Sequence, residues 1–353
     1  MVRTMSLLRA LFSTARALCP PGEHSRTAAG HTALLPDGLP PDHAVLLDAP
    51  DDRLAPALVA AALGDHEPAA KLLATTRGAA EWESRDRYVT RLAAFAHCRD
   101  EWLTGWLAST PGDPDALLVE AEVAVRRAWA SPARAERLGE LGPLIDAAAG
   151  AAPRDPVPWR LALDHARGTR AGHAAFESLW EQAVRRASHH YGCHVAALKY
   201  LSAQRRGAHR ECLDFAEQAA ADALPGSLTR ALPVRAAFAQ LVAGDDGGVP
   251  AERIDRAADL AVELSGRYAP GDPWPAEVRN VLVYVLAGRG RWAAALEQFR
   301  LIGPYATSFP WSSVSDDPLG RFLETRDEAR RATVPAAPSR GRAGRGLSGG
   351  HYA

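Results

Sequence analysis

Apolar residues recur along most of the chain with the spacing of a helix that buries one face. Between residues 276 and 287, Val278, Val281, Leu282, Val285 and Leu286 fall at positions i, i+3, i+4, i+7 and i+8. This spacing places all five side chains on one side of an α-helix, and another element must cover that side. Strictly alternating runs, which are typical of half-buried strands, are nearly absent. The pattern therefore predicts an almost entirely helical protein.

Short breaks rich in Gly, Pro and Asp divide the predicted helices into pairs. Before a helix expected over 114–129, Asp113 can accept hydrogen bonds from the free amides of the first turn, and Pro114 fits the first helical position. The same Asp-Pro pair recurs at 155–156 and 272–273. The first helices of successive pairs are expected to start near residues 54, 81, 114, 156, 190, 228 and 273, with a mean spacing of about 36 residues, so the pairs should stack into an array.

One pair carries a family resemblance. Residues 270–303, PGDPWPAEVRNVLVYVLAGRGRWAAALEQFRLIG, resemble a tetratricopeptide repeat in their Asp-Pro opening, their short glycine turn, and Trp292, Ala295 and Phe299 on the second helix. Residues 190–224 and 153–168 have a similar shape. The resemblance is that of a divergent relative, covers roughly residues 54–303, and implies an all-α, right-handed α-solenoid of about six to seven antiparallel helix pairs. Its implied function is to bind a partner peptide or helix on the concave surface.

Two further segments resemble an uncharacterised actinobacterial family of helical, tetratricopeptide-like proteins. They are EWESRDRYVTRL at 81–92 and HHYGCHVAALKYL at 189–201. This resemblance carries no known function.

Composition changes abruptly at both ends of the predicted array. We expect a mostly disordered N-terminal segment over 1–50, a helical repeat domain over 51–332, and a disordered Arg/Gly-rich tail over 333–353. The first 19 residues are apolar in part, as in a signal peptide, but Arg9 and Arg16 interrupt them and no cleavage site follows. Four cysteines without a CxxC pair are typical of a reducing compartment, so we expect a cytoplasmic protein.

The overall charge disfavours two classes of partner. The 353 residues include 41 Lys and Arg against 42 Asp and Glu, which gives a formal net charge of −1. No net basic field attracts nucleic acid or anionic lipid. Uncharged stretches are also too short to cross a bilayer. We therefore expect a protein or peptide partner, with no nucleic acid and no membrane, and leave the oligomeric state open.

A histidine cluster at 189–194 is the densest group of candidate metal ligands. If a helix starts near residue 190, His190 and His194 lie one turn apart on one face and can hold one metal ion, with Cys212 on the paired helix or Cys193 as the third ligand. The alternative is that the first histidines occupy a connecting loop while the cysteine packs as a small apolar residue.

Basic and amide side chains on the predicted helices are the candidate partner contacts. Arginine recognises carboxylate and phosphate through paired hydrogen bonds, so an arginine-lined groove would bind an acidic peptide or a phosphate. In the alternative, the arginine stems cover the core and their heads reach water. The candidate partner-binding residues are Arg85, Arg127, Arg160, His194, Arg235 and Asn280.

Catalytic motifs are not visible in the sequence. The phosphate-binding pattern GxxxxGK[ST] and the zinc-protease pattern HExxH do not occur, and no glycine-rich loop connects a predicted strand to a helix. The sequence therefore favours a non-catalytic interaction scaffold or adaptor that needs no cofactor. The alternative is an enzyme or metal-binding protein that uses the His190/His194 face.

Overall fold

A computed structural model describes residues 34–204, 208–244 and 248–334, and these residues are almost entirely helical. The α-helices are α2 Ala55–Ala62, α3 Glu67–Gly78, α4 Trp82–Ala96, α5 Glu101–Ser109, α6 Pro114–Ala130, α7 Arg134–Gly139, α8 Gly142–Ala151, α9 Val157–Thr169, α10 His173–Arg186, α11 Tyr191–Gln204, α12 His209–Asp222, α13 Leu232–Ala243, α14 Ala251–Ser265, α15 Ala276–Gly288, α16 Trp292–Ile302, α17 Ser308–Trp311 and α18 Pro318–Thr333. Short 3₁₀ turns occupy Asp42–Ala44 and Leu228–Ala231. The prediction of an all-α protein is confirmed.

The helices pack in sequential pairs, each against its neighbours in the chain. Each predicted first helix begins within three residues of its expected start, if the 3₁₀ turn at Leu228 is taken as the opening of α13. The Asp-Pro break at 113–114 acts as predicted: Asp113 accepts hydrogen bonds from the amides of Asp115 and Ala116 at 2.8 and 3.0 Å, and Pro114 is the first residue of α6. The other two breaks only precede their helices. Asp155 accepts from the amide of Val157 at 2.9 Å, but the residue that precedes α9 is Pro156, and α15 begins at Ala276, after Pro275.

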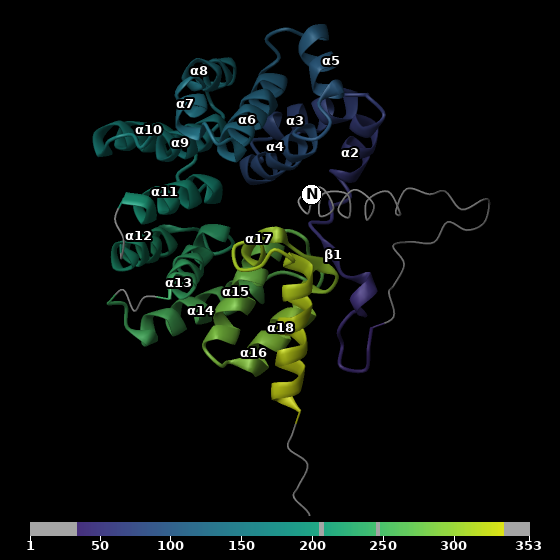
Figure 1. Ribbon diagram of the computed structural model, residues 1–353, viewed down its shortest axis with the longest axis vertical. Coiled ribbons are helices and arrows are strands. Elements are labelled where there is room, and N and C mark those ends of the chain that lie inside the picture. Colours follow the sequence, from purple (N-terminus) through teal and green to yellow (C-terminus); the bar gives the residue numbers. More distant parts are fainter. Residues whose placement is uncertain (1–33, 205–207, 245–247, 335–353) are drawn as a thin grey trace, which may run out of the picture.

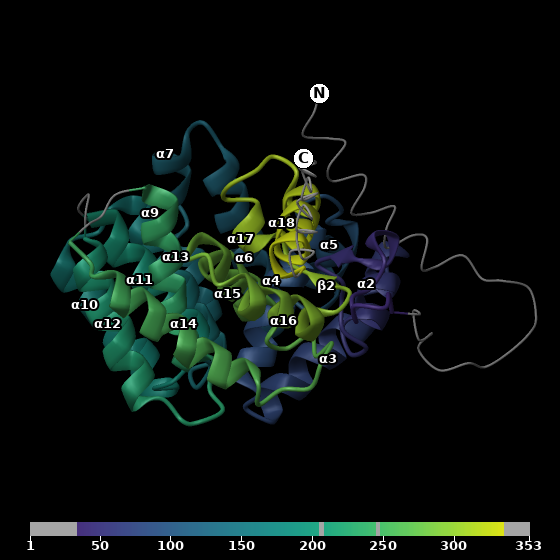
Figure 2. The same cartoon turned by 90° about the horizontal axis from the view of Figure 1, so that it is seen from below.

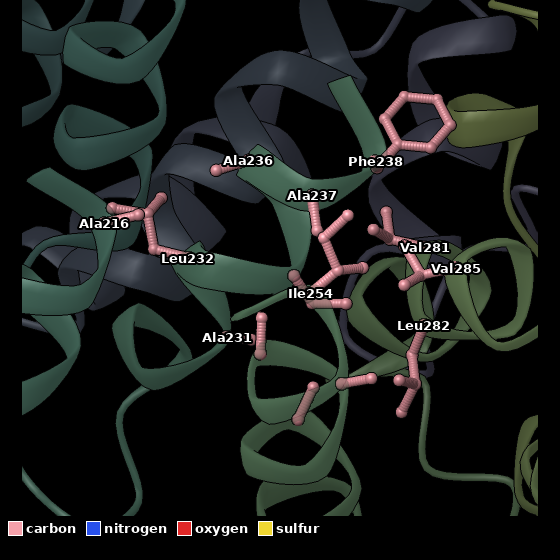
Figure 3. Close-up of a cluster of buried hydrophobic side chains, with 14 of the residues drawn as sticks. Ala216, Ala231, Leu232, Ala236, Ala237, Phe238, Ile254, Val281, Leu282 and Val285 are labelled. Atoms are coloured by element: carbon pink, nitrogen blue, oxygen red, sulfur yellow. The ribbon is translucent and has the colours of Figure 1, made fainter. Parts of the chain in front are cut away.

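The largest core cluster fills the space between α12, α13, α14 and α15. Figure 3 shows Leu232 and Ala237 from α13, Ile254 from α14, and Val281 and Val285 from α15 in this cluster. Alanine is frequent here, for example at Ala236 and Ala237, which are almost fully buried. Small side chains let neighbouring helices approach closely, and the apolar stripe predicted on α15 is covered as expected.

The residues just before the helical array form a feature that the sequence did not predict. Residues 34–51, here called the N-terminal strap, run beside the C-terminal helices (Figure 1). Strand β1, Leu46–Leu47, pairs in parallel with strand β2, Tyr305–Ala306, so residues about 260 positions apart lie side by side. The expected disordered segment over 1–50 is therefore wrong for residues 34–50, while residues 1–33 and the tail from 335 lie outside the described residues.

Apolar packing and arginine contacts hold the strap in place. Leu39 and Val45 are buried in a cluster with Phe299, Trp311 and Phe322. Arg326 on α18 donates to the carbonyl of Pro40 at 3.1 Å, and Arg300 donates to the carbonyl of Asp37 at 2.9 Å. Two buried apolar residues among Pro, Gly and Asp have no helical period, which explains why the pattern did not reveal them. The strap joins the two ends of the array.

Among the described residues, none of the helices is long and apolar enough to cross a membrane.

Candidate functional site

The first helices of the successive pairs form one continuous row. Helices α4, α6, α9, α11, α13 and α15 contact one another in this order, and α4 also contacts α11. Helices α10, α12, α14 and α16 lie further out in the view of Figure 1. We call these six helices, which are the predicted first helices other than α2, the inner row. It carries most of the candidate residues, because it collects side chains from distant parts of the sequence.

A basic residue occupies the fourth position of five inner-row helices, and all five of these residues are buried. In α4, α9, α11, α13 and α15, respectively, these residues are Arg85, Arg160, His194, Arg235 and Arg279. The fourth position lies near the start of its helix. A side chain there that faces the neighbouring helix pair contacts the loops and carboxylates of that pair. Four of the six predicted partner-binding residues thus share one structural position. They are joined by Arg279, which the sequence analysis missed.

Arg85 lies at the centre of a fully buried ion-pair network. Its guanidinium contacts a carboxylate oxygen of Asp155 at 2.5 Å and one of Asp115 at 2.6 Å, and it donates to the carbonyl of Leu73 at 2.9 Å. All three charged side chains are at most 1% exposed. Burial raises the pKa of Asp155 although Arg85 favours its charged form. The network ties α3, α4, α6 and the start of α9 together.

Arg160 forms a second network beside the first. It pairs with Asp86 on α4 at 2.8 Å and with Glu122 on α6 at 2.7 Å, and Asp164 one turn further along α9 lies at 3.6 Å. Opposite charges outweigh the cost of burial and raise the pKa of Arg160. Arg85 and Arg160 were predicted as groove residues for a partner, but their donors are directed to carboxylates within the protein. Buried pairs of this kind fix the geometry of the array more than they stabilise it.

The start of α11 packs against the start of α4 through His190. One ring nitrogen, Nδ1, lies 3.1 Å from Sγ of Cys193, and Nε2 lies 3.7 Å from Asp86 and 4.0 Å from Glu83. The carboxylate of Glu83 also accepts from the amide of Tyr191 at 2.7 Å. Burial lowers the pKa of His190, but Cys193 and the two carboxylates outweigh it and raise the pKa above its ordinary value.

We expect the charged state of His190 to stabilise the fold. Its pKa is higher in the folded chain than in the unfolded chain, so this stabilisation is complete below about pH 6.5 and is lost as the pH rises towards the folded pKa. The difference in unfolding free energy between wild type and His190→Gln should therefore be smaller at about pH 9 than at about pH 6. The exposed His43→Gln is the control. A difference that does not change with pH would contradict this expectation.

A glycine makes the contact between α11 and α4 close. A Cβ atom added to Gly192 would lie 2.0 Å from the carboxylate oxygen of Asp86 and 3.0 Å from the ring of His190. Gly192→Ala should lower the unfolding free energy by about 1–3 kcal/mol, because Asp86 or α11 must shift. Gly150→Ala is the matched control, since Gly150 is an exposed position in α8 with no atom within 4 Å of an added Cβ. Denaturant unfolding of both variants tests this, and equal effects would contradict it.

The predicted metal ligands are not brought together. His194 places Nδ1 2.9 Å from the carbonyl of His190 and packs edge-on against Trp180, and burial lowers its pKa. Cys212 lies in the apolar cluster of α12 to α15. Within the part of the chain that the structure describes, no group of three or more His, Cys, Asp or Glu side chains is arranged to hold a metal ion. The expected trio of His190, His194 and Cys212 is thus not assembled.

Two predicted partner residues lie away from the shared position. Asn280 is fully buried, where it donates to the carbonyl of Ala276 at 2.8 Å and accepts from Nε1 of Trp311 at 2.8 Å. Arg127 is exposed near the end of α6 and pairs with Asp100 at 2.7 Å. Asn280 thus supports the core, and Arg127 does not lie at the fourth position of its helix. A role of either residue in partner binding stays a prediction.

A further group of charged side chains on the inner row combines buried and exposed residues. Arg235 on α13 forms an ion pair with Glu277 on α15, lies 3.4 Å from the hydroxyl of Tyr191, and covers the ring of Phe309 at 4.2 Å. Beside it, Lys199 on α11 is exposed. Arg87 on α4 is half-buried, 6.0 Å from the ring of Trp274. We call Arg87, Lys199, Arg235 and Glu277 the inner charged patch.

A surface depression of about 490 Å³ lies where α4, the loop before α11 and the loop before α15 meet. Trp82, Glu83, Arg186, His190 and Trp274 contribute to its walls. Most of its polar groups already have partners. For example, Arg186 donates to the carbonyl of Pro153 at 2.7 Å and covers the ring of Trp159 at 4.3 Å. The depression exposes aromatic surface beside the inner charged patch, because Trp274 is near both.

The signal for the buried networks was present in the sequence. Inner-row helices open with WESR, VPWR, LPVR and AEVR, so an arginine follows three residues after each helix start. The carboxylates that these arginines contact could not be assigned, since Asp155 lies 70 positions from Arg85 and Asp86 lies 74 positions from Arg160.

In comparisons with known proteins, the chain matches no protein-family model, no curated protein and no solved structure.

Proposed function

We propose that this protein is a non-catalytic interaction scaffold. In this proposal the helical pairs form a right-handed α-solenoid similar to tetratricopeptide repeats, and the inner row binds a segment of a partner protein. The observation that carries the proposal is the inner row itself, in which α4, α6, α9, α11, α13 and α15 contact one another in order. Stacked helix pairs with such a row commonly bind extended peptides or helices.

The burial of the strongest polar network supports a scaffold over an enzyme. Arg85, Asp115 and Asp155 satisfy one another and have almost no contact with solvent. A catalytic group needs access to substrate, and Cys193, which lies against His190 in a geometry like that of a nucleophile and its base, is fully buried. Burial also raises the pKa of the Cys193 thiol, which disfavours the reactive thiolate.

The test is to select binding peptides and to map where they bind. A display library of short random peptides is passed over the full-length protein, and a recovered peptide is added during hydrogen exchange. We expect the peptide to slow exchange in α11, α13 and α15, and to leave the outer helices α10 and α12 unchanged. Protection confined to the outer helices, or failure to recover any peptide above the background of the bare support, would contradict the proposal.

A further inference from the structure

The outer side of α2, at the beginning of the array, is apolar and faces solvent. Ala57 and Ala61 on the other side of this helix are buried in the cluster that α2 shares with α3 and α4. On the outer side, Pro56 is exposed, and Leu63 is 83% exposed, more than any other large apolar side chain of the described residues. The ends of a helical array need a polar outer face to stay soluble, so we expect another segment to cover this side of α2.

A surface depression of about 520 Å³ lies along the outer side of α2. Five apolar residues form its walls between two carboxylates, and the lining contains no Lys or Arg. Asp65 accepts from the amide of Glu67 at 2.9 Å, and neither lining carboxylate forms an ion pair within the described residues. Arg53, the nearest cation in sequence, pairs with Glu81 at 2.7 Å. The lining residues are Asp52, Ala55, Pro56, Val59, Ala60, Leu63 and Asp65.

This combination of charge and apolar surface selects the kind of segment that fits. A second copy of α2 facing the first would bring the carboxylates of one copy against those of the other, whether the two helices ran parallel or antiparallel. Like charges at close range repel each other. The segment that covers α2 should therefore be apolar on one side and carry positive charge.

The chain contains a segment of this kind before the described residues. Residues 5–18 read MSLLRALFSTARAL, and helical spacing places five large apolar residues on one side, with arginines beside them. No Asp or Glu occurs among the first 22 residues. The apolar residues are Leu7, Leu8, Leu11, Phe12 and Leu18, and the arginines are Arg9 and Arg16.

The connection between this segment and the strap is long enough to reach α2. The amide of Leu35 donates to the carbonyl of Leu39 at 2.8 Å, so the chain enters the strap close to Leu39. Leu39 and Asp52 are 13 positions apart in the sequence, so their separation is at most about 45 Å. The 17 positions from Leu18 to Leu35 span up to about 55 Å when extended.

We propose that residues 5–18 dock as a helix on the outer side of α2 and cover the beginning of the array. The apolar side of this segment packs against Val59 and Leu63, and its arginines approach Asp52 and Asp65. The docked segment covers the first helix pair as the strap and α18 cover the last pair.

A photo-crosslinker in the full-length protein identifies what covers α2. Leu63→p-benzoylphenylalanine places the probe in the depression. Leu224→p-benzoylphenylalanine is the matched control, since Leu224 is also an exposed leucine but follows α12. After irradiation, mass spectrometry should find residues 5–18 joined to the probe at 63 in at least about tenfold higher yield than to the probe at 224. An equal mixture of isotope-labelled and unlabelled protein shows whether the new bond lies within one chain.

Two aspartate substitutions test the orientation of the segment. Leu11→Asp puts a charge on the apolar side and should lower the yield at position 63 by about tenfold or more. Ser13→Asp adds the same charge on the opposite side, so it should lower the yield by less than about threefold. Replacing Arg9 and Arg16 together by Glu should lower the yield by about fivefold or more, because two attractions become repulsions. Thermal unfolding checks that each variant is folded.

Several results would overturn the proposal. Cross-links between labelled and unlabelled copies would show that α2 takes the N-terminal segment of a second copy instead. A yield at position 63 no higher than at position 224, cross-links at 63 only to residues other than 5–18, or equal effects of Leu11→Asp and Ser13→Asp would show that the segment does not dock on α2. The scaffold proposal stands in each case, because α2 is not part of the inner row.

Discussion

Replacing Arg85 with alanine is expected to lower the unfolding free energy by about 3–5 kcal/mol. The substitution removes the cation that contacts both Asp115 and Asp155, and both carboxylates are almost fully buried. Arg77 still pairs with Asp115 at 3.0 Å, but Asp155 keeps no cation within 4 Å among the described residues. An uncompensated buried carboxylate is far more costly than a missing pair at the surface. Urea or guanidinium unfolding of the full-length protein measures the effect.

A control and a rescue make this expectation specific. Arg127→Ala removes an ion pair of similar length whose partners are both exposed, so it should cost less than about 1 kcal/mol. Combining Arg85→Met with Asp115→Asn and Asp155→Asn should recover part of the loss, because the charges leave together and the amide oxygen of Asp155→Asn can still accept from the amide of Val157. An Arg85→Ala effect no larger than that of Arg127→Ala would show that water reaches the network.

Replacing Trp311 with alanine should also cost about 3–5 kcal/mol. Trp311 is fully buried and packs edge-on against Phe322 on α18 and against Tyr284 on α15. Its Nε1 donates to Oδ1 of Asn280 at 2.8 Å, so truncation also leaves a buried acceptor without its donor. The cavity would open at the point where the strap meets the C-terminal helices.

Trp311→Phe separates the two parts of this effect. Phenylalanine keeps most of the apolar volume but cannot donate to Asn280, so it should cost about 1–3 kcal/mol, clearly less than alanine. Hydrogen exchange should show faster exchange at the amide of Leu46, which bonds to the carbonyl of Pro304 at 2.8 Å, in Trp311→Ala. If Trp311→Ala and Trp311→Phe lower the unfolding free energy equally, packing around the ring contributes little to the stability of the fold.

Local rules predicted the helices well. The start of α6 follows from Asp113, which caps its first turn, and the buried face of α15 follows from its apolar spacing. These signals act within a few residues, so they are readable from sequence alone. The resemblance to tetratricopeptide repeats and the direction of curvature stay predictions.

Long-range contacts limited the prediction of the site. Arginines were expected at a partner groove, yet Arg85 and Arg160 are enclosed by carboxylates that approach from other pairs. Helical spacing correctly placed His190 and His194 one turn apart, but His194 turns towards a carbonyl and Trp180, and Cys212 lies in a separate core. Which carboxylate reaches which cation depends on how the pairs stack, and spacing along the chain does not contain that information.

The position of the N-terminal strap has a consequence for the protein as it is made on the ribosome. Leu39 and Val45 are translated before Phe299, Trp311 and Phe322, which bury them. Until these later residues have been synthesised, the strap has no native surface to cover it. Its apolar segment is therefore available to chaperones for as long as residues 299–322 are missing from the nascent chain.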